Sequence, residues 1–394
     1  MELNEIQTKL SSLNVDGYLC IDYECKNTAL ISLIGRRMLT RKLLCFIPKE
    51  GKATLITHII DTVYLKDELV TSQFDLLVYK TWQEMLELET KLLKDKKKIM
   101  MDVSSNGLLM RISTADYGSV SFVKNLGIEI VSSGDLLQSL TAVLTEKQYE
   151  NELDACKKTM QIKDEAFKLI KLEIEEFGQT NEYKIQQYIA RRFNEEGMTF
   201  DDPPLVATGK NASNPHYSPT KDNFGIIKEG DLVLIDMWAK NDNEDGVYAD
   251  ITWMGYVGNE IPQIYKDRFE IVKVARDGVI SFLKEELPKR KVYAFEADDV
   301  ARRIITKAGY GEYFTHRVGH NIAVDVSPHG PGANLDNYET HDERTLMEGT
   351  SFSDEPGIYA EDFGMRSETN LHIRNNKLEV VAGLQDEIIQ IMKL

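Results

Sequence analysis

Five side chains that can bind metal ions stand in four short segments of the C-terminal half of this chain: Asp236, Asp250, His320, Glu355 and Glu368. Four are carboxylates and one is an imidazole, a set that suits two hard or borderline divalent cations side by side. Four carboxylate charges balance two dications, so this acidic cluster is expected to be unstable when empty. Two adjacent metal ions activate a shared water molecule, and the chemistry that this arrangement suits best is hydrolysis.

The two aspartates are each attached to an apolar segment with strand character. Asp236 is predicted to end the strand 232–235, and Asp250 opens the run 251–254. Residues 241–246 predict a turn, so the two segments should form a hairpin with an acid on each strand. Either aspartate alone could be a solvated strand edge. An unpaired carboxylate is costly to bury at the end of an apolar strand, however, and a bound metal ion removes that cost.

The other candidates have weaker local signals. His316 and His320 are four residues apart without the glutamate of the His-Glu-x-x-His zinc motif, so one could bind metal and the other substrate. Glu355 stands directly before a Pro-Gly turn that fixes the direction of its carboxylate. Arg366 should share a strand face with Glu368, where it could orient a carboxylate, bind a substrate carboxyl group or form an ordinary ion pair.

Residues 1–140 are predicted to form a separate α/β domain. It contains no group of residues whose types and spacing suggest a catalytic or metal-binding site. Short apolar runs bounded by turn residues indicate strands, and a 3.6-residue periodicity indicates a helix. The predicted elements are strands at 17–21, 98–103 and 128–131, a hairpin of residues 42–48 and 53–56, and a helix at 82–93.

The second predicted domain, residues 146–394, carries the acidic cluster. A long helix at 147–177 should end at Gly178, and Thr180 should cap the helix that follows. The apolar stripe of the long helix consists of Leu153, Cys156, Met160, Phe167, Ile170 and Ile174. Further helices are predicted at 264–287 and 297–308. The segments 228–236 and 347–355 each consist of a Glu-Gly turn and then a strand that ends in an acid, which indicates an internal duplication.

The gross properties exclude several classes of protein. The chain has 394 residues, enough for two domains, and a net charge of −17 that argues against binding nucleic acid. No apolar run approaches the roughly 20 residues that a membrane span needs, and no secretory signal is seen. The four cysteines have no metal-binding spacing, which favours reduced thiols and a cytoplasmic location.

Together these segments resemble the creatinase/aminopeptidase P family of metallopeptidases, which has the pita-bread fold. The family's five ligands occur in order in a Gly-Asp strand, Asp-Ile-Thr, His-x-x-Gly-His, Glu-Pro-Gly-x-Tyr and Gly-x-Arg-x-Glu. The matching residues are Asp236, Asp250, His320, Glu355 and Glu368. The resemblance implies an α/β (α+β) protein: a creatinase-like N-terminal α/β domain and a pita-bread domain with pseudo-twofold duplicated halves. Departures include Trp238, where the family often has glycine, and a longer Asp236 to Asp250 spacing.

The resemblance also implies which other residues act. Glu355, His216 and His329 would be catalytic, with Glu355 moving protons and the histidines holding the carbonyl or its oxyanion. The substrate would be bound by His216, His316, His329, Tyr359 and Arg366. The family's third histidine stands in a Val-His motif after the ligand histidine. Here either Ser327 replaces it or His329 supplies it after a two-residue insertion. We favour His329.

The implied function is an aminopeptidase that hydrolyses the N-terminal Xaa-Pro bond with a hydroxide held between two metal ions. Oxygen-rich ligation favours Mn²⁺, with Co²⁺ or Zn²⁺ as alternatives. The alternatives are a prolidase (Xaa-Pro dipeptidase), a metal-free amidinohydrolase like creatinase, which gaps in the ligand set would indicate, and a non-catalytic binding protein on the same fold. The implied partners are a peptide with proline at its second position and a second copy of the chain in a homodimer, but neither nucleic acid nor membrane.

Overall fold

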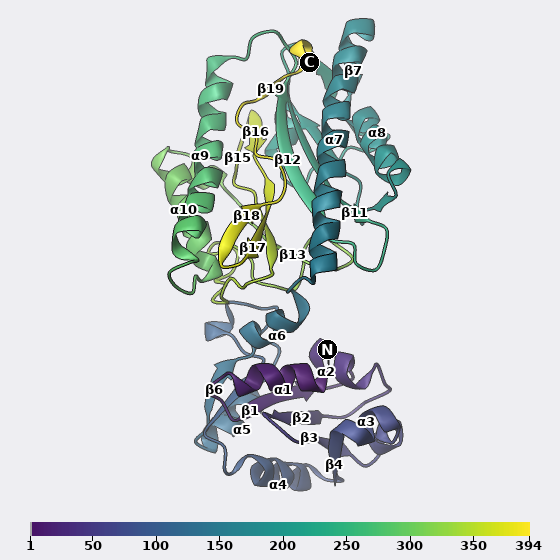
Figure 1. The fold of residues 1–394 in the computed structure, drawn as a ribbon, viewed down its shortest axis with the longest axis vertical. Coiled ribbons are helices and arrows are strands. Elements are labelled where there is room, and N and C mark those ends of the chain that lie inside the picture. The colour runs from purple at the N-terminus through teal and green to yellow at the C-terminus, as the bar shows by residue number, and fades with distance from the viewer. Residues whose placement is uncertain (1) are drawn as a thin grey trace. The chain divides into compact units, whose positions relative to one another are not determined.

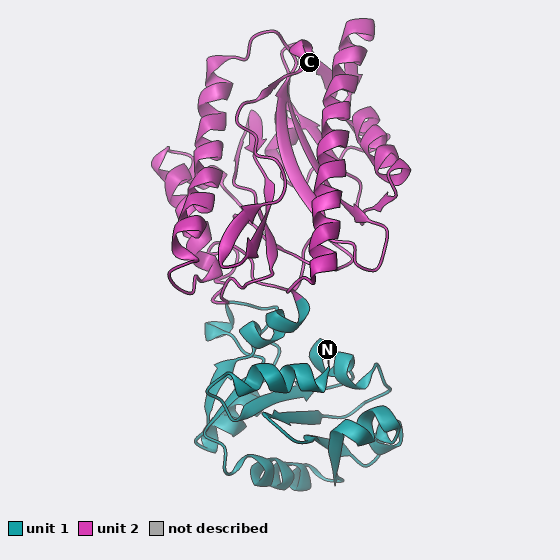
Figure 2. Cartoon of the chain, in the orientation of Figure 1, with its two compact units in different colours: residues 1–141 teal, residues 142–394 magenta. Residues whose placement is uncertain are grey.

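The computed structural model describes residues 2–394. The chain divides into two compact units, residues 1–141 and residues 142–394 (Figure 2). Unit 1 contains a mixed six-stranded sheet with the strand order β4-β3-β2-β1-β5-β6. Its helices are α1 (Leu3–Ser11), α2 (Thr28–Ile34), α3 (Glu68–Gln73), α4 (Trp82–Leu93), α5 (Tyr117–Asn125) and α6 (Gly134–Thr141). Its strands are β1 (Gly17–Asp22), β2 (Leu43–Pro48), β3 (Ala53–His58), β4 (Phe74–Tyr79), β5 (Lys98–Met101) and β6 (Glu129–Ser132).

Helices cover both faces of this sheet. Successive side chains on a strand point to opposite faces, so one strand contributes apolar residues to both layers of helices. Leu19 packs with Leu93 of α4 and Val123 of α5. The next residue, Cys20, packs with Ile6 of α1 on the other face. The predicted hairpin is confirmed as the antiparallel pair β2–β3, and the predicted helix at 82–93 is α4.

Unit 2 carries four long helices and several small sheets (Figure 1). The helices are α7 (Glu146–Phe177), α8 (Glu182–Glu195), α9 (Gln263–Glu286) and α10 (Ala294–Lys307). The strands of the first half are β7 (Gln179–Asn181), β8 (Met198–Thr199), β9 (Leu205–Thr208), β10 (Ile226–Lys228), β11 (Leu232–Asn241) and β12 (Ala249–Tyr256). Those of the second half are β13 (Asn321–Ile322), β14 (Ser351–Asp354), β15 (Gly357–Ala360), β16 (Phe363–Arg366), β17 (Thr369–Arg374), β18 (Lys377–Val380) and β19 (Ile389–Gln390).

The long helix α7 begins and ends on strong local signals. The Thr145 side chain accepts a hydrogen bond from the backbone N–H of Gln148, and Gly178 ends the helix with a left-handed φ of 75°. The prediction that Thr180 caps α8 is wrong, since Asn181 caps it by accepting from the N–H of Lys184. Leu153 was expected in the buried stripe, but it is 42 % exposed.

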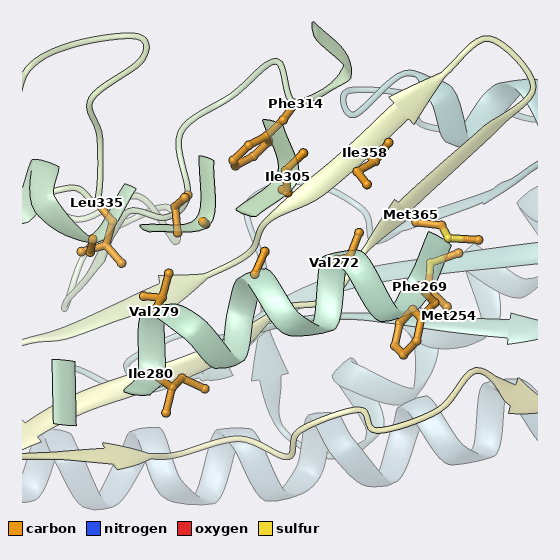
Figure 3. Close-up of a cluster of buried hydrophobic side chains, with 14 of the residues drawn as sticks. Met254, Phe269, Val272, Val279, Ile280, Ile305, Phe314, Leu335, Ile358 and Met365 are labelled. Carbon is orange, nitrogen blue, oxygen red and sulfur yellow. The ribbon is translucent and has the colours of Figure 1, made fainter. Parts of the chain in front are cut away.

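The hairpin β11–β12 separates two hydrophobic cores. Ile235 and Met237 pack against α7 and α8, whereas Leu234 and Met254 pack against α9. Figure 3 shows Met254 close to Phe269 of α9. Because side chains alternate along a strand, Asp236 faces away from the core formed with α7 and α8. The prediction that the strand ends at Asp236 is wrong, because β11 continues to Asn241.

The second half of unit 2 repeats this plan with a different set of strands. β14 pairs antiparallel with β17, and α9 lies beside α10. Figure 1 shows one helix pair, α7 with α8, on one side of the strands and the other pair, α9 with α10, on the opposite side. Among the described residues, no helix is both long enough and apolar enough to cross a membrane.

Candidate metal centre

The β11–β12 register positions the two aspartates. Asp236 lies opposite Thr252, and Trp238 lies opposite Asp250, so all four side chains belong to one face of the hairpin. The carboxylates of Asp236 and Asp250 are therefore diagonal neighbours on the face of the hairpin that lines the cavity. Both are buried, Asp236 at 7 % exposure and Asp250 at 4 %.

His320 and Glu355 come from two segments that lie side by side. The backbone N–H of Glu355 donates to the carbonyl of Val318 at 2.7 Å, and the N–H of Ser353 donates to the carbonyl of His320 at 2.9 Å. Gly319 permits this close approach, because a Cβ there would lie 2.0 Å from the carbonyl oxygen of Ser353. The segments therefore hold the imidazole beside the carboxylate.

Glu368 follows β16 and precedes β17. The prediction that Arg366 and Glu368 belong to one strand is wrong, because β16 ends at Arg366. The backbone N–H of Glu368 donates to the carbonyl of Thr252 at 3.2 Å. The Thr252 hydroxyl lies 2.6 Å from a Glu368 oxygen and 3.2 Å from an Asp236 oxygen, so this hydroxyl links the two acids.

The structure brings the members of the acidic cluster together. Ligand atoms of Asp250, His320 and Glu368 all lie within 4.8 Å of one another. Glu355 joins them through His320, whose Nε2 lies 3.5 Å from Glu355 Oε1. Asp236 joins them through Thr252, and all five side chains line one cavity of about 690 Å³.

The protonation of His320 shows that this cluster fits a cation. Its Nδ1 lies 3.3 Å from the carbonyl oxygen of Asn321, so Nδ1 carries the proton and Nε2 carries the lone pair. That lone pair faces carboxylate oxygens of Asp250 and Glu355, each 3.5 Å away. Lone pairs and carboxylates in such contact repel one another unless a cation lies among them. Oxygen ligands with one imidazole are the donor set of a divalent metal ion.

The electrostatics point the same way. Burial raises the pKa of Asp250 well above its usual value, and the charges of Glu368, Asp236 and Glu355 raise it further. Burial also raises the pKa of Glu355 to about 7, although Arg366 acts in the opposite direction. The protein has therefore buried more negative charge than one arginine balances, and divalent cations would supply the missing positive charge.

A hydrogen-bonded chain runs from the cluster to His316. Arg366 pairs with Asp236 through Nη2 and donates through Nη1 to the Tyr359 hydroxyl at 3.1 Å. His316 Nδ1 lies 2.6 Å from the carbonyl oxygen of Arg317, so Nε2 accepts from the Tyr359 hydroxyl at 2.8 Å. Burial lowers the pKa of His316 to about 3, so this histidine is neutral. Tyr359 and Arg366 thus fix its orientation.

The remaining predicted residues line the cavity from two loops. His216 is exposed in a loop after the short helix η3 (Gly209–Ser213). The His329 ring lies 4.0 Å from the His320 ring, measured between centroids. Ser327 lies in the same wall, and its hydroxyl accepts from the N–H of His329 at 3.2 Å. Trp238 also lines the cavity and donates to Asp201 at 2.7 Å.

One residue that holds this site carries no signal in the sequence. Glu182, in the first turn of α8, is fully buried. Its carboxylate accepts from the Tyr217 hydroxyl at 2.6 Å, from the Thr208 N–H at 2.7 Å and from the Asn211 amide. It also accepts from the Gly225 N–H. The Glu182 carboxylate thus fixes the conformation of the loop that carries His216 through hydrogen bonds.

Comparison with known proteins agrees with this geometry. Residues 154–375 match metallopeptidase family M24. This chain belongs to that family. The expectations of a metallopeptidase and of a pita-bread fold are therefore confirmed, and membership of family M24 implies divalent metal ions.

Individual relatives of this M24 protein carry more specific names. It is 38 % identical over 165 residues to an Xaa-Pro dipeptidase of Lactobacillus helveticus, a match that covers 42 % of this chain and 40 % of the relative. It is 26 % identical over 340 residues to an Xaa-Pro dipeptidase of Pyrococcus furiosus, covering 86 % of each. The crystal structure of dipeptidase PepE from Mycobacterium ulcerans has a TM-score of 0.62 at 20 % identity, covering 99 % of this chain and 96 % of PepE, which shows the shared fold.

Proposed function

We propose that this M24 protein is a prolidase that hydrolyses Xaa-Pro dipeptides with two bound divalent cations. The observation that carries this proposal is the convergence of the acidic cluster in one cavity, where the His320 lone pair faces two carboxylates. When bound, paired cations lower the pKa of water and polarise a carbonyl group. The ligand set favours Mn²⁺ or Co²⁺ because it is rich in oxygen.

Glu355 is proposed to move the protons. It would take a proton from the attacking water while the water oxygen forms a bond to the scissile carbonyl carbon. The same carboxyl group would then pass the proton to the proline nitrogen as the C–N bond breaks. Its position supports this role, because it lies in the cavity wall beside His320 and its Oε1 accepts from the Ser353 hydroxyl at 3.2 Å.

The histidines are proposed to hold the substrate. His216 and His329 line the cavity from separate loops, and either can donate to a carbonyl oxygen or to the oxyanion that replaces it. The ring contact between His329 and His320 supports His329, rather than Ser327, as the third histidine of the family pattern. The neutral His316 would line the pocket, oriented by Tyr359 and Arg366.

The choice between a dipeptidase and an aminopeptidase rests on the relatives. The aminopeptidase P activity expected from the sequence has no specific support, because the relatives described above are named Xaa-Pro dipeptidases. The prolidase alternative fits these names better. The predicted homodimer stays a prediction, which light scattering of the purified protein would test.

The test begins with protein stripped by a chelator. Adding Mn²⁺ back should restore cleavage of Ala-Pro, with much slower cleavage of Ala-Pro-Ala. Preference for the tripeptide would replace the prolidase assignment with an aminopeptidase, and no metal-dependent cleavage of either would reject both. Glu355→Gln should abolish turnover while metal is still bound. The matched control is Glu361→Gln, which changes an exposed glutamate in the same region.

A further inference from the structure

One fully buried carboxylate takes no part in the proposed reaction: Glu152, on the inner face of α7. It is 0 % exposed, and the groups that favour its charged form are hydrogen-bond donors rather than cations. A buried carboxylate without a cation is costly unless hydrogen bonds satisfy its oxygens. The donors to Glu152 therefore indicate what this side chain holds in place.

Two hydrogen bonds reach Glu152 from the strands next to the metal centre. The side-chain amide of Asn370 donates to Oε1 at 2.9 Å, and the hydroxyl of Ser351 donates to Oε2 at 2.6 Å. Asn370 stands two residues after Glu368, and Ser351 stands four residues before Glu355. Both belong to the antiparallel pair β14–β17. Glu152 thus fixes α7 to the strands that adjoin two members of the acidic cluster.

The Asn370 amide also holds the backbone at the start of β12. Its Oδ1 accepts from the N–H of Asp250 at 2.9 Å, and its Nδ2 donates to the carbonyl of Tyr248 at 2.9 Å. Further along β12, the carbonyl of Thr252 accepts from the N–H of Glu368 at 3.2 Å. A side-chain amide therefore takes the place of a neighbouring strand here, and it fixes the backbone of Asp250 relative to that of Glu368.

Glu152 determines which way this amide faces. An amide side chain has an oxygen that accepts and an NH₂ group that donates two hydrogens. In Asn370 the oxygen binds the N–H of Asp250, while the NH₂ group donates to both the Tyr248 carbonyl and Glu152. If the amide turned over, its NH₂ group would face the N–H of Asp250 and its oxygen would face the two acceptors. The carboxylate of Glu152 therefore favours the orientation that holds Asp250.

We propose that Glu152 is a positioning residue of the metal centre, which acts through Asn370 to set the separation of Asp250 and Glu368. The proposal rests on the proposed prolidase function with two bound cations. It adds a residue on α7 that lies outside the cavity wall. Residues that orient metal ligands without binding the metal affect metal affinity and activity.

The test removes the acceptor and leaves every ligand in place. Glu152→Leu introduces a side chain of similar size that cannot accept a hydrogen bond from Asn370. After removal of metal with a chelator, its affinity for Mn²⁺ should be roughly 10- to 100-fold below that of the wild-type protein in isothermal titration calorimetry. At saturating Mn²⁺ the variant should have a lower kcat for Ala-Pro with a nearly unchanged KM, because the proposed substrate contacts are intact.

Glu152→Gln should behave like the wild-type protein. Its oxygen can still accept from Asn370, while its NH₂ group donates to the Ser351 hydroxyl, which then donates to His372 Nδ1, 2.8 Å away. Burial lowers the pKa of His372 to about 4, so this ring is neutral and its Nδ1 can accept. Since leucine and glutamine have similar sizes, a role in packing alone would not separate the two variants.

Two further single variants complete the design. Asn370→Ala should lower Mn²⁺ affinity at least as much as Glu152→Leu does. Combining the two changes should cause no further loss, because both residues act through the same amide. The control is Ile162→Ala, in the buried core of α7, which should lower the free energy of unfolding in urea without changing Mn²⁺ affinity.

The outcomes separate this proposal from the proposed function. Wild-type Mn²⁺ affinity in Glu152→Leu, or an equal loss in Glu152→Leu and Glu152→Gln, would overturn the positioning role although the enzyme is a peptidase. Additive losses in the double variant would do the same. If Glu152→Leu does not fold, the proposal requires a loss in Asn370→Ala and wild-type affinity in Glu152→Gln. Failure of the metal-loaded wild-type protein to cleave Ala-Pro would instead reject the prolidase assignment.

Discussion

Tyr217 is the residue directly after His216, and its hydroxyl donates a hydrogen bond to the buried carboxylate of Glu182 at 2.6 Å. This contact joins the first turn of α8 to the loop that carries a proposed substrate-binding histidine. The groups that reach Glu182 from the loop are all donors, so a carboxylate satisfies them and an amide side chain does not.

Glu182→Gln should therefore disturb both the loop and the activity. The amide NH₂ group would face donors, leaving at least one of them unsatisfied at a cost of about 1–3 kcal/mol. We expect a lower free energy of unfolding in urea and a lower kcat/KM for Ala-Pro. Glu176→Gln, at an exposed position near the end of α7, is the control and should change neither. Unaltered stability of Glu182→Gln would show that the loop does not depend on this carboxylate.

Thr252→Val should weaken metal binding without removing a ligand. The Thr252 hydroxyl accepts from Arg366 Nε at 2.8 Å and lies 2.6 Å from Glu368, so it orients groups in the acidic cluster. Loss of a residue that orients metal ligands costs about 10- to 100-fold in metal affinity. Isothermal titration calorimetry with Mn²⁺ measures this loss. An unchanged Kd in a folded variant would contradict the role assigned to Thr252.

Asp250→Asn should affect stability in opposite directions with and without metal. In a chelator, the variant should be at least as stable as the wild-type protein, because it removes one of several buried charges that repel one another. With Mn²⁺ at ~100 times its Kd, the wild-type protein should gain about 3 kcal/mol and the variant much less. Thermal unfolding with EDTA and with Mn²⁺ tests both statements, with Asp242→Asn in the exposed loop as control. A variant destabilised equally in both conditions would argue against a metal site here.

Glu89→Gln should remove a pH dependence from the stability of unit 1. Glu89 of α4 is 1 % exposed, and neither of its carboxylate oxygens has a hydrogen-bond partner in the described residues. Burial raises its pKa from 4.5 to about 7. The protonated form is thus favoured in the folded state, so its stabilising contribution is complete below pH 4.5 and is lost as the pH rises through 7.

The shift corresponds to about 3 kcal/mol between acidic and alkaline pH. Urea unfolding at pH 5 and pH 8.5 measures it, and Glu89→Gln should be the more stable protein at pH 8.5. Glu87→Gln changes an exposed glutamate on the same helix and should behave like the wild-type protein at both pH values. If Glu89→Gln follows the wild-type pH dependence, the buried carboxyl group is not its source.

The sequence predicted the helices well because the residues that start and end a helix stand next to it in the chain. The cap at Thr145 and the left-handed Gly178 lie within a few residues of the helix ends they determine. Leu153 was misplaced because the first half of α7 buries a polar group on its inner face. There Glu152 accepts hydrogen bonds from Ser351 and Asn370, residues about 200 positions away in the sequence.

The residues of the candidate site also divide into those that local sequence patterns could predict and those that they could not. Its acids could be predicted because each stands in a recognisable motif next to a strand or turn. Glu182 could not be predicted, because its importance lies in contacts with segments that have no periodic relationship to it in the sequence. Asp236 was placed at the end of its strand because a buried carboxylate looks like a boundary, whereas Thr252 and Arg366 supply its partners inside the sheet.

The alternation along β11 restricts how this site can change during evolution. Inserting a single residue before Asp236 within the strand would exchange its two faces, so that Met237 would enter the cavity and the aspartate would enter the apolar core. Length variation is better tolerated between the strands at the exposed residues 242–244, where the β11–β12 ladder has already ended. The connection between the strands can therefore lengthen there while Asp236 and Asp250 keep their places on the two paired strands.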